Sequence, residues 1–257
     1  NLGEDPVIVG LLDKGVNNGH KLLSPFLPDD RRASVVDGVG VGHEGFHGTC
    51  MAGLIVYGDL SKYQIGEGAA EVNHALASVK LLSDNHTNNP SLYGLLTIRA
   101  IEASETFGGK IICMAVTEDE ERNDGTPTSW SAAIDNALYN HGACDRMMLV
   151  SAGNTDFNIL DEQNYLDTLA VSSMQSPTQA VNAIAVGAYT ELTVSNREGW
   201  TAIAPPQGMS PMTRTSVMWR GKNPKPDIVM EGGNAAHHEI LGNAELQEIS
   251  MVSTISH

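Results

Sequence analysis

The chain has 257 residues, enough for one large domain with a buried core, and its 41% hydrophobic and 18% charged residues indicate a globular protein, not a disordered one. A formal net charge of -16 repels phosphate and argues against nucleic-acid binding. No apolar run approaches the roughly 20 residues of a membrane span. The first predicted element is the apolar run 7–12, typical of a strand buried on both faces, and Asp13 follows at its carboxyl end.

Strands and helices alternate along most of the remaining chain. Further strands are predicted at residues 34–36, 72–82, 110–116, 147–150 and 182–188. Helices are predicted at residues 47–57, 89–108 and 126–142. The apolar side of the second helix is predicted to hold Leu92, Leu95, Leu96 and Ile101, and that of the third Trp130, Ile134 and Leu138. This order predicts an α/β fold with a mainly parallel central sheet flanked by helices, in one domain of residues 1–257. From Thr190 onward little regular structure is predicted.

The cysteines and the first residue bear on compartment and processing. Cys50, Cys113 and Cys144 make an odd count without pair spacing, so we expect no disulfide framework. That observation leans towards a reducing compartment such as the cytoplasm, and the sequence otherwise leaves the location unknown. There is no signal peptide, and Asn1 is not an initiator methionine, so we expect a processed chain or a fragment.

The glycine-rich stretch 40–56 fits two unrelated site patterns. His43-Glu44-Gly45-Phe46-His47 spells H-E-x-x-H, which binds zinc when both histidines lie one turn apart on a helix. Gly40, Gly42 and Gly45 disfavour a helix there, so we expect His43 in a loop and His47 near the helix start. Residues 40–45 also spell the dinucleotide pattern G-x-G-x-x-G between a predicted strand and a helix, although that motif should follow the first strand.

Four separated segments, taken in order, resemble the subtilisin-like serine peptidase (subtilase) family. Residues 9–17 are similar to its aspartate strand and turn, 47–53 to its histidine helix, 150–154 to its oxyanion asparagine segment, and 225–229 to a late core strand. Residues 180–187 are also similar to a strand of that family. The resemblance spans nearly the whole chain and implies a serine endopeptidase of subtilisin-like fold that hydrolyses peptide bonds in proteins or peptides.

The resemblance implies a role for each matching residue. His47 would be the general base, Asp13 would orient its imidazole, and Asn154 would donate its side-chain amide to the oxyanion. Residues 115–117 (Ala115, Val116, Thr117) would pair with an extended substrate, and residues 151–153 (Ser151, Ala152, Gly153) would form a wall of the pocket for the residue before the cut. No metal or other cofactor is predicted, and the sequence does not show whether calcium binds.

Two departures from the family pattern stand out. Cys50 lies where the family often has a second histidine. The family's nucleophile motif, Gly-Thr-Ser before a helix of small residues, does not occur in residues 1–257. Ser250, Ser253 and Ser256 lie near the expected place but have no helix after them. We therefore expect the chain to be truncated before the nucleophilic serine, which lies beyond His257.

Three functions stay open on the sequence. The first is a serine endopeptidase with an Asp-His-Ser triad. The second is a catalytically inactive, peptidase-like scaffold that binds peptides or a protein partner. The third is a zinc or dinucleotide enzyme that uses the glycine-rich loop. The joint presence of Asp13, His47 and Asn154 favours the first, because an inactive scaffold has no need to keep these three together.

Overall fold

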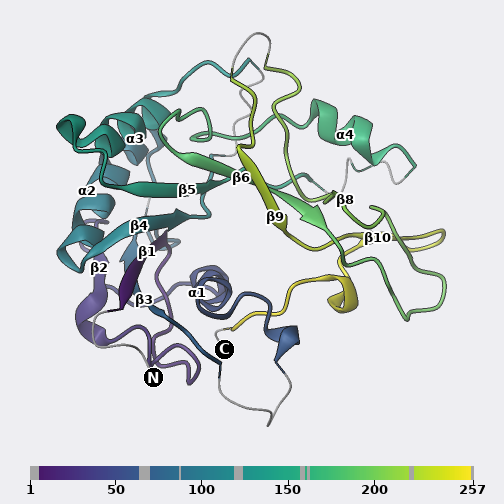
Figure 1. Cartoon of the computed structure of the whole chain (residues 1–257), viewed down its shortest axis with the longest axis horizontal. Helices are drawn as coiled ribbons and strands as arrows, with labels where there is room; N and C mark the ends of the chain where they lie inside the picture. Colours follow the sequence, from purple (N-terminus) through teal and green to yellow (C-terminus); the bar gives the residue numbers. More distant parts are fainter. Residues whose placement is uncertain are drawn as a thin grey trace.

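The computed structural model describes residues 6–63, 70–86, 88–118, 124–156, 160, 163–219 and 223–255. Its central sheet has the strand order β2–β3–β1–β4–β5–β6, and both β8 and β9 pair with β6 (Figure 1). The strands are β1 (Val7–Asp13), β2 (Arg32–Ser34), β3 (His74–Lys80), β4 (Gly109–Met114), β5 (Met147–Ser151), β6 (Ile184–Thr190), β8 (Gly208–Met209) and β9 (Ile228–Glu231). All pairings are parallel except that of β6 with β8. The predicted α/β fold with a mainly parallel sheet is confirmed.

Helices cover both faces of this sheet. They are α1 (His47–Tyr57), α2 (Tyr93–Thr106), α3 (Ser129–Tyr139) and α4 (Tyr165–Val171), and short 3₁₀ turns lie at Asp29–Arg31, Leu60–Lys62, Pro90–Leu92, Asn140–Gly142 and Gln247–Ile249. Successive residues of β1 face opposite ways: Leu12 belongs to the core that contains α2 and α3, whereas Leu11 belongs to the core that contains α1. A small second sheet joins β7 (Thr201–Ala202), β10 (Ala236–His238) and β11 (Gly242–Ala244).

The helix boundaries follow the local sequence signals. Thr128 caps α3 through a capping box with Ser131. Gly108, just after α2, has a φ of +85°, which favours glycine. α1 begins at His47 and ends at Tyr57, as predicted. None of the helices in the described ranges is long and apolar enough to cross a bilayer.

Some predicted details were wrong. Leu92 and Leu95 are exposed, because α2 instead turns small residues inward: Gly94 lies so close to α3 that a Cβ there would be 2.9 Å from the Cβ of Ala133. The second strand covers Arg32–Ser34, two residues earlier than predicted. α4 was missed, because a seven-residue helix gives a short periodic signal. β9 overlaps the late core strand that the family resemblance implied at 225–229, although the periodicity predicted little regular structure after Thr190.

The topology places a crevice at the carboxyl end of β1. β1 pairs with β3 on one side and with β4 on the other, so the strand order reverses there. In open parallel sheets such a reversal separates the connections on the two faces and leaves a crevice that ligands occupy. Asp13 is the last residue of β1 and therefore lies at this point.

Candidate active site

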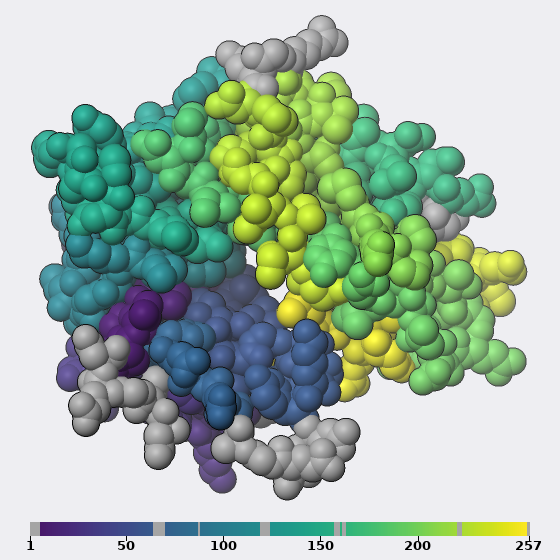
Figure 2. Space-filling view, viewed as in Figure 1, coloured from purple at the N-terminus to yellow at the C-terminus, as the bar shows by residue number. Residues whose placement is uncertain are grey.

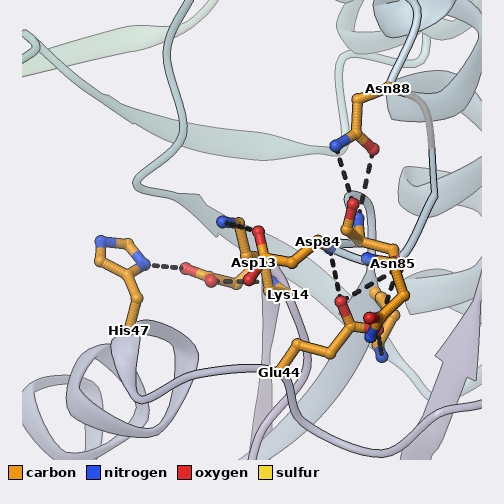
Figure 3. A network of polar contacts seen from close by, with 9 residues as sticks. Asp13, Lys14, Glu44, His47, Asp84, Asn85 and Asn88 are labelled. Atoms are coloured by element: carbon orange, nitrogen blue, oxygen red, sulfur yellow. Dashed lines mark hydrogen bonds and ion pairs between the residues drawn. The ribbon is translucent and has the colours of Figure 1, made fainter.

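Asp13 and His47 form a hydrogen-bonded pair at the carboxyl end of β1 (Figure 3). The Asp13 side chain is 1% exposed, and its Oδ2 lies 2.8 Å from His47 Nδ1. The backbone N–H of Lys14 donates to the other carboxylate oxygen at 2.7 Å. Because a carboxylate only accepts hydrogen bonds, Nδ1 carries the ring proton. The lone pair of the neutral imidazole is thus on Nε2, the tautomer that a general base needs.

His47 is the first residue of α1, with a side chain that is 47% exposed. No hydrogen bond from its Nε2 is formed within the described part of the chain. The hydrogen bond to Asp13 raises the pKa of His47 above its usual value, partial burial opposes this, and the Asp13 charge adds to the increase. The backbone approaches β1 closely here, since a Cβ on Gly48 would lie 2.2 Å from the carbonyl oxygen of Gly15. Glycine at position 48 therefore permits the contact between α1 and the strand end.

The loop before α1 is tied to β3 by a buried ion pair that the sequence patterns did not predict. Lys80 Nζ, with a side chain 2% exposed, donates to Glu44 Oε1 at 2.7 Å. Ser83 Oγ lies 2.9 Å from both Glu44 oxygens, and the N–H of Asp84 donates to Oε2 at 2.5 Å. These contacts, the one to Lys80 first, lower the pKa of Glu44 to about 2. The missed signal is a lysine at the end of an apolar strand, because a buried ammonium group needs a partner.

Asn154 lies in the turn that follows β5. The residue is exposed, and its side-chain amide makes no hydrogen bond to the described residues. Its backbone carbonyl accepts a hydrogen bond of 2.7 Å from Nε of the buried Arg214, whose Nη1 also donates to Ser173. The next residue, Thr155, is fixed by hydrogen bonds to the carbonyls of Met212 and Thr213. The turn is therefore held by its backbone, which leaves the Asn154 amide available.

A cavity of about 630 Å³ connects α1 with the Asn154 turn. Its lining includes Met51, Leu54 and Ile55 of α1, Asn154, the carboxyl ends of β4 and β5, and the middle of β6. Figure 2 shows the surface hollowed between the blue region, which contains α1, and the yellow region near residue 250. The lining is mostly apolar side chains and glycines, so the cavity suits an apolar occupant beside α1.

The predicted substrate-binding segments lie in two environments. Ala115, Ser151, Ala152 and Gly153 line the cavity with Asn154. Val116 instead packs against the core on the α2 and α3 side. Thr117 donates a 2.8 Å hydrogen bond to Oε1 of the buried Gln175, and that oxygen would lie 2.2 Å from a Cβ on Gly153. Gln175, which no sequence motif singled out, therefore bridges the two predicted segments.

The described serines considered as nucleophiles, Ser250 and Ser253, have their hydroxyls bound to backbone carbonyls. Ser253 Oγ donates to the carbonyl of Cys50 at 2.5 Å, and Ser250 Oγ donates to Leu246 at 2.8 Å. Thr254 Oγ1 likewise donates to Thr49 at 2.6 Å. Each hydroxyl proton is used by a backbone carbonyl, which does not suit attack assisted by His47. Ser256 lies outside the described residues.

The other two patterns in the glycine-rich stretch do not fit the geometry. His43 lies in the loop before α1, so the two histidines of H-E-x-x-H are not one turn apart on a helix, and Glu44 is bound to Lys80. Within the described ranges, no group of three or more potential metal-binding side chains occurs. The G-x-G-x-x-G pattern follows β2, an edge strand, whereas the dinucleotide motif belongs at the strand reversal.

The three cysteines, all free, differ in accessibility and are expected to react with iodoacetamide at different rates. Cys144 is exposed and should react first. Burial raises the pKa of Cys50, and it raises that of Cys113 to about 11, so their thiolate fractions are low and Cys113 should react last. Peptide mass spectrometry after timed alkylation measures the order, and unfolding in urea should remove the difference. Equal rates at Cys113 and Cys144 in the folded chain would contradict the described packing.

Comparison with known proteins identifies the class to which this fold and this Asp–His pair belong. The subtilase family matches residues 4–256. The chain therefore belongs to the subtilase family of serine peptidases. A comparison with curated proteins gave no match.

Solved structures of serine proteases share the fold at low sequence identity. The epidermin leader peptide processing serine protease of Staphylococcus aureus has a TM-score of 0.54 and 14% identity, over 90% of this chain and 53% of that one. The nisin leader peptidase of Lactococcus lactis has a TM-score of 0.54 and 16% identity, over 91% of this chain and 64% of that one. The subtilisin-like protease Apa1 of Pseudoalteromonas sp. AS-11 has a TM-score of 0.52 and 15% identity, over 91% of this chain and 43% of that one. The chain thus spans about half the length of the first of these.

Proposed function

We propose that the protein is a serine endopeptidase, in which Asp13, His47 and a serine outside residues 1–257 form the catalytic triad and Asn154 donates to the oxyanion. The observation that carries the proposal is the buried Asp13 carboxylate bonded to Nδ1 of a half-exposed His47. This contact fixes the imidazole with Nε2 as the acceptor at the strand reversal of the sheet. The substrates are extended peptide segments of proteins.

Each group has a defined role in the reaction. His47 Nε2 takes the proton of the serine hydroxyl as the serine oxygen attacks the scissile carbonyl, and then gives that proton to the leaving amine. The Asp13 carboxylate stabilises the imidazolium that forms in between. The Asn154 amide donates to the oxygen that becomes negative in the tetrahedral intermediate. Water then hydrolyses the acyl-enzyme with His47 again as the base.

The apolar cavity between α1 and the Asn154 turn supports the placement of the nucleophile. It adjoins α1 one turn after His47, and Met51, Leu54 and Ile55 line it. An apolar helix that enters there would bring its first residues close to His47 and Asn154. Ser250 and Ser253 have their hydroxyls bound to backbone carbonyls, so they do not compete for this role.

A fluorophosphonate probe tests the proposal, because it labels a serine only where a base has activated it. We expect no labelling of residues 1–257 alone and stoichiometric labelling, at a serine after His257, of a longer form that includes the following segment. The matched control is His47→Gln in the longer form, which should lose the label.

Two outcomes would contradict the proposal. Stoichiometric labelling of a serine within residues 1–257, mapped by mass spectrometry, would overturn the placement of the nucleophile. A folded longer form that binds peptides but never takes the label would favour the inactive, peptide-binding scaffold over the peptidase.

A further inference from the structure

We propose that Glu44, Lys80, Ser83 and Asp84, here called the Glu44 cluster, position the catalytic pair by fixing the loop before α1 against β1 and β3. The inference rests on the proposed function of Asp13 and His47 and adds positioning residues to it. In this arrangement Glu44 is held by three groups that follow or end β3, and His47 begins α1 three residues later (Figure 3).

The cluster is connected to Asp13 through the backbone on both sides. Lys80 is the register partner of Asp13 in the parallel pair β1–β3, and the N–H of Leu81 donates to the carbonyl of Asp13 at 2.8 Å. The N–H of Glu44 donates to the carbonyl of Lys14 at 3.0 Å, and the N–H of Lys14 donates to Asp13 Oδ1 at 2.7 Å. The aspartate and the loop that leads to the histidine are therefore anchored to the same strand end.

Burial makes this anchor specific. The Lys80 side chain is 2% exposed and that of Glu44 13% exposed, so water cannot replace either partner at small cost. The Glu44 carboxylate also accepts from Ser83 Oγ and the Asp84 N–H, which fixes the orientation of its plane. On the solvent side of the cluster, Lys14 Nζ and Asp84 Oδ1 form an exposed ion pair at 2.5 Å.

The geometry does not suit Glu44 as a catalytic base, and this supports its role in positioning. The carboxylate that the zinc pattern would use as a base is directed at Lys80 and Ser83, and its pKa is lowered to about 2, so it does not accept protons at neutral pH. Glycines allow the backbone on both sides to come close: a Cβ on Gly15 would lie 2.8 Å from the carbonyl oxygen of Gly42.

The test is an NMR titration of the His47 ring in the chain of residues 1–257, which needs neither nucleophile nor substrate. The hydrogen bond to Asp13 is the main cause of the raised His47 pKa, so this pKa reports whether the pair is aligned. The ionisable groups on β1, α1, β3 and the loops that join them near His47 are Asp13, Lys14, His43, Glu44, Cys50, Tyr57, His74, Lys80 and Asp84. Of these, Asp13 raises the pKa of His47 and Lys14 lowers it. The His47 signal is assigned by its loss in His47→Gln.

The decisive variant is Glu44→Gln with Lys80→Met. It removes one charge of each sign, so the direct electrostatic effects on His47 oppose each other and no buried charge is left unpaired. We expect the His47 pKa to fall by about one unit, because the imidazole loses alignment with Asp13. An unchanged His47 pKa in the folded double variant would overturn the proposal.

Two further variants complete the design. Ser83→Ala removes hydrogen bonds to Glu44 without changing charge, and it should lower the His47 pKa by less than the double variant does. If the double variant does not fold, an unchanged His47 pKa in Ser83→Ala would overturn the proposal. The control, Glu105→Gln, breaks a similar partly buried pair with Arg146 and should leave the His47 pKa unchanged. Failure of the fluorophosphonate test would remove the peptidase function while leaving this measurement valid.

Discussion

Replacing Asp13 with asparagine is expected to lower the kcat of the active, nucleophile-containing form by about 10⁴-fold, the loss measured for the equivalent substitution in another serine protease. The asparagine amide can donate to Nδ1, so the ring proton moves to Nε2, and the imidazole can no longer accept the proton of the serine. The buried position makes solvent a poor substitute for the carboxylate, since Asp13 is 1% exposed.

Peptide hydrolysis, with kcat and KM determined separately, measures this effect. The matched control is Asp227→Asn. Asp227 accepts hydrogen bonds from Lys225 and from the N–H of Ala185, a residue of β6, and so lies away from β1 in the sheet. This substitution should affect stability more than kcat. A kcat within tenfold of the unchanged protein in Asp13→Asn would remove the aspartate from the proposed triad.

The pH dependence of the same enzyme follows from the raised His47 pKa. The base acts in its neutral form, so kcat/KM should rise with pH through the His47 pKa, with a midpoint above 6.5. Because the folded pKa is raised, protonated His47 stabilises the fold fully below its unfolded pKa, and this contribution is lost as pH rises through the folded pKa. Residual activity in Asp13→Asn should have its acid-side midpoint at a lower pH, and a midpoint that does not move would contradict the role of Asp13.

The second large effect is expected for Asn154→Ala, which should lower kcat by about 10²–10³-fold with little change in KM. This is the magnitude measured for a subtilisin oxyanion asparagine. The reason is that the amide contacts the oxygen only when it becomes negative, so substrate binding does not depend on it. The backbone carbonyl of Asn154 keeps its hydrogen bond to Arg214 in the variant, so the turn should persist.

A matched control for this substitution is Asn182→Ala. Asn182 is an exposed asparagine that binds Asp135 at the α3 side of the molecule, outside the cavity lining. Hydrolysis of a chromogenic peptide should be unchanged in this control. A proportional rise of KM with unchanged kcat in Asn154→Ala would show that the asparagine binds substrate instead of the transition state.

The sequence predicted those parts of the site that come from single elements with a clear pattern. Asp13 follows a continuous apolar strand, and His47 follows helix-breaking glycines, so the sequence alone was enough to place both positions on the fold. The pairing of Glu44 with Lys80 could not be predicted, because it joins side chains 36 positions apart whose contact depends on the register of β1 and β3. The contact of Gln175 with Thr117 joins positions 58 apart and was missed for the same reason.

The contact of residues 250–255 with α1 has a consequence for how the protein folds. The hydrogen bond from Ser253 to Cys50 joins positions 203 residues apart, and Thr254 to Thr49 joins positions 205 apart. Closing a loop of that length costs roughly 5 kcal/mol of chain entropy, which local interactions do not offset in advance. The first α/β units can assemble through contacts that are near in sequence. Residues 250–255, by contrast, can pack on α1 only after the strands that lie between them in the sequence have assembled. Amide protons of residues 250–255 should therefore exchange through local opening, earlier than those of β1 and β3.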